Sequence, residues 1–310
     1  MLPRLRTSFE KSGVQGIALL GPSNGKPDRS VQGVRLSVGL HVHLYERNEG
    51  TDAEHGYLHV DGIVAGWDDK HQCWFATYDW DALTWTREME GMTDEIQFDD
   101  WVAWVFDRPV PDPGWPLGGR TDWNVLTPSL SLEYLRRLFE ESGELLRQFS
   151  DAQVNKGVFF CIDPGFSDYA FSLLDRTLLW APRLRCVRSI LRLFEFFAAR
   201  CSPHLSHLDE LGANPLNSIC YMFWDILPIY GHSDEPAFAN LDHALLAVMT
   251  ETLRLPCDAC REGALHGLGH WQSDYPNEVQ QIIDRFLAEN PMIRPELRRY
   301  AESARWGCVQ

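Results

Sequence analysis

The sequence lacks any long apolar segment, and it is short of positive charge. No apolar run approaches the length of about 20 residues that a membrane-spanning helix needs, so we expect no membrane among the partners. The chain has 28 Lys and Arg residues against 44 Asp and Glu residues, which gives a net charge of −16 at pH 7. This charge repels phosphate backbones, so we expect no nucleic acid either.

One short basic segment departs from this acidic composition. The segment RLRCVRSILR carries four arginines, namely Arg183, Arg185, Arg188 and Arg192. We interpret them as solvated charges on a helix, although they would also suit an anionic partner.

The common signatures of catalysis are missing as well. Residues 21–26, GPSNGK, lack the full glycine spacing of a phosphate-binding loop, and a proline follows the lysine. No G-x-S-x-G segment marks a nucleophilic serine. The basic start of the chain, MLPRLRTSFEKSG, is not followed by an apolar stretch, so we expect no secretory leader.

Cysteine, by contrast, is plentiful. Eight cysteines are scattered through the 310 residues, mostly inside apolar runs. Disulfide frameworks belong mainly to short secreted chains, so we interpret these residues as free, buried thiols. This interpretation predicts a cytoplasmic protein.

Strand-like segments come first along the chain. In three runs apolar and polar residues alternate, or β-branched and aromatic residues gather, and turn-rich segments separate them. The runs are residues 34–46, 56–67 and 72–80. Their close spacing predicts a small antiparallel meander or barrel. The apolar residues of 96–109 fit neither a strand nor a helix cleanly, so both remain open there.

The pattern changes near residue 125. Residues 109–123 are rich in Pro and Gly, which indicates a connection between two domains. Beyond them apolar residues recur at spacings of three and four, as in amphipathic helices. We therefore expect an α+β protein with a small β-rich N-terminal domain at 1–124. A larger all-α domain of antiparallel helix hairpins is expected at 125–310.

The helical half offers clear start and stop signals. Its predicted helices are residues 129–149, 185–201, 214–227, 241–255, 257–271, 276–290 and 294–307. Ser129 or Ser131 would cap the first of them. Four prolines lie where a helix would begin, at which point a missing N–H costs nothing: Pro215, Pro256, Pro276 and Pro295. Asn290 followed by Pro291 is a stop signal.

The last four helices form two pairs, at about 241–271 and 276–307, each with a very short link. Pairs that repeat every thirty-odd residues are typical of stacked helical hairpins. In these residues, and particularly in the segment REGALHGLGHW, the chain resembles the HEAT-like and armadillo-like α-helical repeats. The resemblance is one of architecture and covers only this C-terminal part. It implies a protein-binding scaffold and carries over no catalytic residue.

Residues 256–271, PCDACREGALHGLGHW, raise the question of a metal site. On one helix, at about 100° per residue, Cys257 and Cys260 fall in an apolar stripe, whereas His266 and His270 fall on the far side. The two pairs are also separated by roughly 14 Å along the axis. A single tetrahedral zinc cannot bind all four, because its ligands lie within about 2.3 Å of the metal. We therefore expect core thiols that point inward and imidazoles that point outward.

The far side of this helix is the first candidate site. Glu262, His266 and His270 are spaced four residues apart and would form one stripe, and His pairs at this spacing can hold a metal. The alternative is that the histidines are buried between stacked helices and bound to neighbouring polar groups. Gly263, which flanks the stripe with two further glycines, indicates that another backbone packs very closely there.

A second candidate metal site lies in the strand-like half. His41 and His43 would share one strand face, and His59 and Asp61 follow in the next strand. Such residues can converge on a divalent metal, as a His and carboxylate triad requires. Histidines that alternate on an exposed sheet face are the simpler interpretation.

These observations lead to two hypotheses of function. The first is a non-catalytic protein-binding scaffold, for example an inhibitor or immunity-type protein that sequesters a basic partner, since a charge of −16 favours fast association with such a partner. It requires no cofactor. The alternative is a metal-dependent enzyme with a His and Glu site and a divalent metal.

Overall fold

The computed structural model describes residues 2–7, 9, 13–22, 34–48, 56–71, 73–86, 96–108, 110 and 126–309. The chain forms two compact units, Met1–Ala103 and Trp104–Gln310. The fold class is α+β, with all described strands in the first unit and most of the described helices in the second, as predicted. The predicted boundary between residues 124 and 125 lies outside the described residues.

The first unit contains one sheet with the strand order β1-β3-β4-β5-β2, and β6 pairs with β4. The strands are β1 (Arg4–Arg6), β2 (Ile17–Pro22), β3 (His41–Asn48), β4 (Gly56–Asp68), β5 (Cys73–Tyr78) and β6 (Thr84–Thr86). Strands β3, β4 and β5 form the predicted antiparallel meander. Strand β1 adds to it in parallel with β3, and β2 pairs antiparallel with β5.

The sheet encloses its own small core. Val42, Leu44 and Val64 are completely buried on its inner face, as alternation along a strand requires. The two ends of the strand order also meet, because the Thr7 hydroxyl after β1 donates to the carbonyl of Leu19 in β2 at 2.8 Å. The sheet therefore curls towards a barrel.

The remaining described elements are mainly helices. They are η1 (Trp80–Ala82), α1 (Phe98–Phe106), α2 (Pro128–Glu140), α3 (Ser142–Leu145), η3 (Leu146–Gln148), α4 (Asp151–Ile162), η4 (Tyr169–Leu173), α5 (Trp180–Ala198), η5 (Ser206–Leu208), α6 (Pro215–Ile226), α7 (Ala239–Thr252), α8 (Asp258–Trp271), α9 (Pro276–Glu289) and α10 (Pro295–Ala304). The ambiguous segment 96–109 is thus a helix over most of its length. Within the described residues, no helix has both the length and the apolarity to cross a bilayer.

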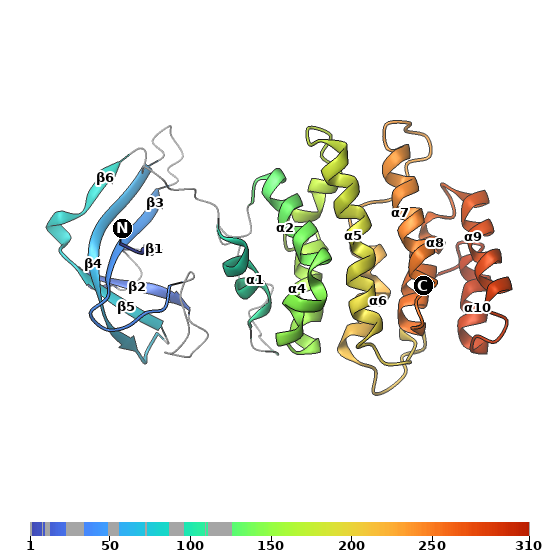
Figure 1. Ribbon diagram of the computed structural model, residues 1–310, viewed down its shortest axis with the longest axis horizontal. Coiled ribbons are helices and arrows are strands. Elements are labelled where there is room, and N and C mark those ends of the chain that lie inside the picture. Colours follow the sequence, from blue (N-terminus) through green and yellow to red (C-terminus); the bar gives the residue numbers. More distant parts are fainter. Residues whose placement is uncertain are drawn as a thin grey trace. The chain divides into compact units, whose positions relative to one another are not determined.

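The helices of the second unit follow one another in chain order along the unit (Figure 1). Helix α2 packs on α5, and α5 packs on α7. In a second rank, α4 packs on α6, α6 on α8, and α8 on α10. Each pair of successive long helices therefore contributes one helix to each rank, which is an arrangement of stacked helix hairpins.

Three helices begin at a proline that was predicted to start a helix, whereas other predicted helix starts differ from the structure. Helices α6, α9 and α10 begin at Pro215, Pro276 and Pro295. The cap of α2 is Thr127, which accepts from the Leu130 amide, so the prediction of Ser129 or Ser131 was wrong. Helix α4 was not predicted, because its first half is mostly polar and its second half is one continuous apolar run, which leaves little helical periodicity.

Helix α8 is buried almost all round, because α5, α6, α7, α9 and α10 all pack against it. Cys257 and Cys260 point inward as expected. Glu262 and His266, however, are also buried, so the expectation that this side faces outward was wrong for them. His266 instead fits the alternative interpretation, a histidine buried between stacked helices and bound to a neighbouring polar group. At Gly263 a side chain would overlap the carbonyl oxygen of Cys220 in α6, which confirms the expected close approach of another backbone.

Candidate metal centre

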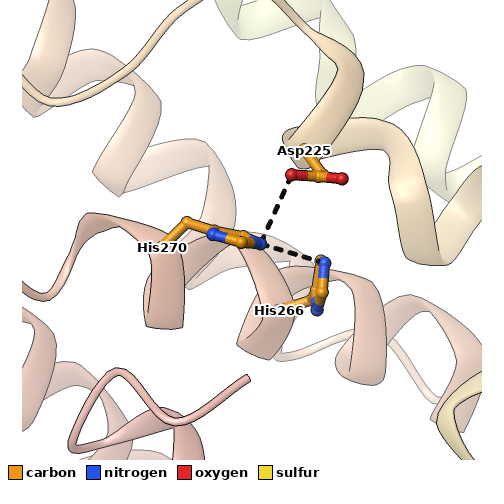
Figure 2. Close-up of side chains that lie close together, drawn as sticks. All are labelled: Asp225, His266 and His270. Carbon is orange, nitrogen blue, oxygen red and sulfur yellow. Dashed lines mark hydrogen bonds and ion pairs between the residues drawn. The ribbon is translucent and has the colours of Figure 1, made fainter. Parts of the chain in front are cut away.

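Two helices bring three potential ligands together near their C-terminal ends. His266 and His270 lie on successive turns of α8, and Asp225 lies in the last turn of α6. Figure 2 shows the imidazole of His270 between the other two side chains. Its Nε2 lies 3.1 Å from Nε2 of His266 and 3.4 Å from Oδ1 of Asp225. The three ligand atoms all lie within 4.8 Å of one another.

These spacings suit a shared metal ion. With metal–ligand bonds of about 2.0–2.1 Å, neighbouring ligand atoms lie roughly 3.0–3.4 Å apart. Two imidazoles and one carboxylate are a common donor set for zinc, iron and manganese. The protein supplies three ligands, which leaves coordination positions for water or a substrate.

His266 is hydrogen-bonded to one tyrosine, which is hydrogen-bonded to a second. Its Nδ1 lies 2.7 Å from the hydroxyl of Tyr300, which in turn donates to the hydroxyl of Tyr221 at 3.2 Å. Because Tyr300 donates to Tyr221, we assign the His266 proton to Nδ1, from which it is donated to Tyr300. The Nε2 lone pair then faces His270 and Asp225. A hydrogen bond to the other ring nitrogen is what orients metal-binding histidines.

The surroundings keep His266 uncharged. Burial, and then the neighbouring His270, lower the pKa of His266 to about 4, while Asp225 acts in the opposite direction. A neutral imidazole is the form that binds metals. His270 and Asp225 have side chains that are 38% and 37% exposed, so solvent reaches the centre from their side.

Glu262, the third residue of the predicted stripe, does not belong to this centre. Its carboxylate accepts from the backbone amides of Ser206 and His207 at 2.8 and 2.9 Å. It also pairs with Nδ1 of His207 at 2.5 Å. Through these hydrogen bonds Glu262 connects η5 to α8. The imidazole of His207 stacks on Tyr300, with the ring centres 4.2 Å apart, which connects this anchor to the metal centre.

The second predicted site, on the sheet, brings together part of its residues. His43 in β3 faces Asp61 in β4, with Nδ1 and Oδ1 2.5 Å apart. The ring of His59 lies 5.1 Å from that of His43. His41 is exposed at the start of β3. The contact between His43 and Asp61 is a cross-strand interaction that requires no metal.

Two of the four arginines of the basic segment form ion pairs within the helical unit. Arg183 is buried and donates to the carbonyl of Leu173. Arg185 pairs with Glu140, and Arg192 pairs with Glu195. Arg185 and Arg192 are exposed, which agrees with the interpretation of solvated charges on a helix, whereas the burial of Arg183 does not.

Sequence reasoning did not identify Asp225 or Tyr300 as part of the centre. One signal was available, because Asp225 is the single charged residue of α6. Tyr300 gave no such signal, since its position beside His266 depends on how α10 packs on α8. No family model, no curated protein and no solved structure matches the chain.

Proposed function

We propose that the protein is a non-catalytic, HEAT-like scaffold that binds a basic protein partner, in the manner of an inhibitor or immunity-type protein. The observation that carries this proposal is an apolar surface at the ends of two helix hairpins. Leu211, in the link between η5 and α6, is 94% exposed, and Met292, in the link between α9 and α10, is 92% exposed. Exposed apolar side chains that lie in one patch with polar residues at its rim mark interaction sites.

The η5–α6 link and the α9–α10 link are in contact and form one continuous surface. Arg294, two residues after Met292, donates to Glu210 at 2.8 Å and to the carbonyl of Pro203 at 3.0 Å. A hollow of about 160 Å³ opens beside them, and the half-exposed Leu208 lies at its rim. It is lined by His207, Leu208, Glu296, Arg299, Tyr300 and Ser303. We call these residues, with Leu211 and Met292, the hairpin-end surface.

Charge selects the class of partner. The chain carries a net charge of −16, so a basic protein approaches faster and is held in register more readily than an acidic one. The proposal also places the protein in the cytoplasm, because all eight cysteines are free thiols and six of them are buried.

The test combines a double substitution, Leu211→Asp with Met292→Asp, with capture from the native host. We expect the wild-type chain to retain one basic protein at low salt and to lose it progressively at high salt. The double variant should lose that protein at every salt concentration. Leu179→Asp is the matched control, since Leu179 is 78% exposed but precedes the first turn of α5, a helix about 28 Å long, whereas Leu211 follows the last turn of that helix.

Retention of the same protein by the double variant would contradict the proposal, as would a partner that binds more tightly at high salt.

A metal-dependent enzyme is the second candidate, favoured by the convergence of Asp225, His266 and His270. It predicts that the purified chain carries a stoichiometric divalent metal that His270→Ala removes. His243→Ala is the control, because His243 is exposed on α7 and bonds to the carbonyl of Ala239. Hydrolytic activity that disappears together with this metal would favour the enzyme over the scaffold.

A further inference from the structure

Tyr300 in α10 contacts both the candidate metal centre and the hairpin-end surface. Its hydroxyl lies 2.7 Å from Nδ1 of His266, which is one of the three potential ligands. Its ring stacks on the imidazole of His207, with the ring centres 4.2 Å apart and the planes inclined by 22°. Tyr300 and His207 both line the hollow of the hairpin-end surface. Because Tyr300 is only 7% exposed, the surrounding packing holds it in this position.

The residues of this connection belong to three successive hairpins of the stack. Asp225 lies in α6 of the α5–α6 hairpin, and His266 and His270 lie in α8 of the α7–α8 hairpin. Tyr300 lies in α10 of the α9–α10 hairpin, and α10 packs on α8. An ion at the centre would therefore join the α5–α6 and α7–α8 hairpins directly. It would reach the third hairpin through the hydrogen bond between His266 and Tyr300.

An ion at the centre would also fix the direction of this hydrogen bond. The Nε2 atoms of His266 and His270 lie 3.1 Å apart, so in the metal-free chain one of them donates a proton to the other. If His266 donates, its Nδ1 carries no proton and accepts from the Tyr300 hydroxyl. If His270 donates, Nδ1 of His266 carries the proton and donates to Tyr300. A metal ion requires both Nε2 lone pairs, so only the direction from His266 to Tyr300 remains, and the proton of His270 moves to its Nδ1 by exchange with solvent.

We infer that one Zn²⁺ ion, bound by Asp225, His266 and His270, controls the hairpin-end surface through Tyr300. Two imidazoles and a carboxylate suit zinc, and three protein ligands leave one tetrahedral position for water. The ion fixes the Tyr300 hydroxyl and thereby stabilises the wall of the hollow. The role of that surface in binding a partner rests on the proposed scaffold function, whereas the link between zinc and the hollow does not.

The control acts in both directions. Zinc binds the arrangement in which α6, α8 and α10 are packed together, so free zinc stabilises that arrangement by mass action. By linkage, a protein that holds the hollow in the same form raises the affinity for zinc by the factor by which zinc raises the affinity for that protein. Zinc and the partner are therefore expected to bind cooperatively.

Titration of the full chain with zinc in competition with a chromogenic chelator tests the metal site. We expect one ion per wild-type chain and no comparable binding by His270→Ala. Tyr300→Phe should weaken zinc binding by about tenfold to a hundredfold, because the hydrogen bond that orients His266 is lost. Tyr275→Phe is the matched control. Tyr275 is also 7% exposed, but it donates to Asp242 in α7, outside the centre, so its loss should leave the zinc affinity unchanged.

Hydrogen exchange tests the link to the hollow with zinc as the only added ligand. Zinc should slow exchange of the α10 amides by a larger factor than exchange of the α2 amides, since α2 packs on α5 in the other rank. In Tyr300→Phe at saturating zinc the two helices should respond alike. If that variant fails to fold, the wild-type chain and His270→Ala still decide. A wild-type chain that binds no zinc, or in which bound zinc slows α10 no more than α2, would overturn the inference.

Capture from the native host, repeated with zinc and with a chelator, separates this inference from the proposed function. We expect the wild-type chain to retain the basic partner more strongly with zinc, and Tyr300→Phe to remove this difference. Equal retention under both conditions would overturn the control of binding and leave the scaffold proposal intact. If no basic protein is retained under either condition, the scaffold proposal fails, and hydrogen exchange alone decides whether zinc acts on the hollow.

Discussion

Glu262 is a carboxylate without exposed surface, and its oxygens accept from two backbone amides and the ring of His207. Such bonds to a charged group compensate for the loss of water around it. Glu262 supplies the hydrogen-bond acceptor that these backbone amides of η5 need. A polar side chain on a buried helix face is therefore no evidence of solvent exposure.

We predict that Glu262→Gln lowers the free energy of unfolding by about 2 kcal/mol, since an amide accepts fewer and weaker hydrogen bonds than a carboxylate. Urea denaturation monitored by circular dichroism measures the change. Glu251→Gln is the control: Glu251 is 46% exposed and pairs with Arg254, so its loss should cost less than about 1 kcal/mol. Equal effects of the two substitutions would show that the hydrogen bonds between Glu262 and η5 do not stabilise the fold.

At the scale of elements, helix α8 is the central packing element of the helical unit. It contacts both ranks of helices, and its glycines allow these contacts to be close. A glycine in a helix ordinarily costs about 1 kcal/mol relative to alanine. At Gly263 this cost is offset by the packing of α6 against α8.

Gly263→Ala should therefore destabilise the protein despite the better helix propensity of alanine. The added methyl group would overlap the carbonyl oxygen of Cys220, and overpacking of this kind costs about 1–3 kcal/mol. Gly143→Ala in α3 meets no atom within 4 Å and should be neutral or stabilise by up to about 1 kcal/mol. Thermal unfolding distinguishes the two, and a stabilised Gly263→Ala variant would contradict the close approach.

At the scale of the whole molecule, helix α1 contributes to the core of the helical unit. The ring of Trp104 meets that of Phe160 edge-on with centres 5.3 Å apart, and Phe106 stacks on Phe149 at 5.6 Å. Phe106 also fills the space that a side chain at Gly157 would occupy. The helical unit therefore needs residues that precede the segment where the helical pattern of the sequence becomes obvious.

We predict that a fragment of residues 96–310 unfolds cooperatively, and that a fragment of residues 126–310 is less stable by at least about 3 kcal/mol. Loss of one large buried aromatic ring costs about that much. Chemical denaturation of both fragments measures the difference. Equal stability would mean that Trp104 and Phe106 contribute nothing to the helical core.

The sequence alone determined the fold class, the three central strands, most helices and the burial of Cys257 and Cys260. These features follow from periodicity, proline positions and composition, which act over a few neighbouring residues. Only the tertiary structure decided that Asp225 joins His266 and His270, and that Cys220 lies against the carbonyl of Ala259 in α8. A helical wheel describes one helix, and it cannot show that other helices cover every side of α8. Residues far apart in sequence meet only when those helices pack.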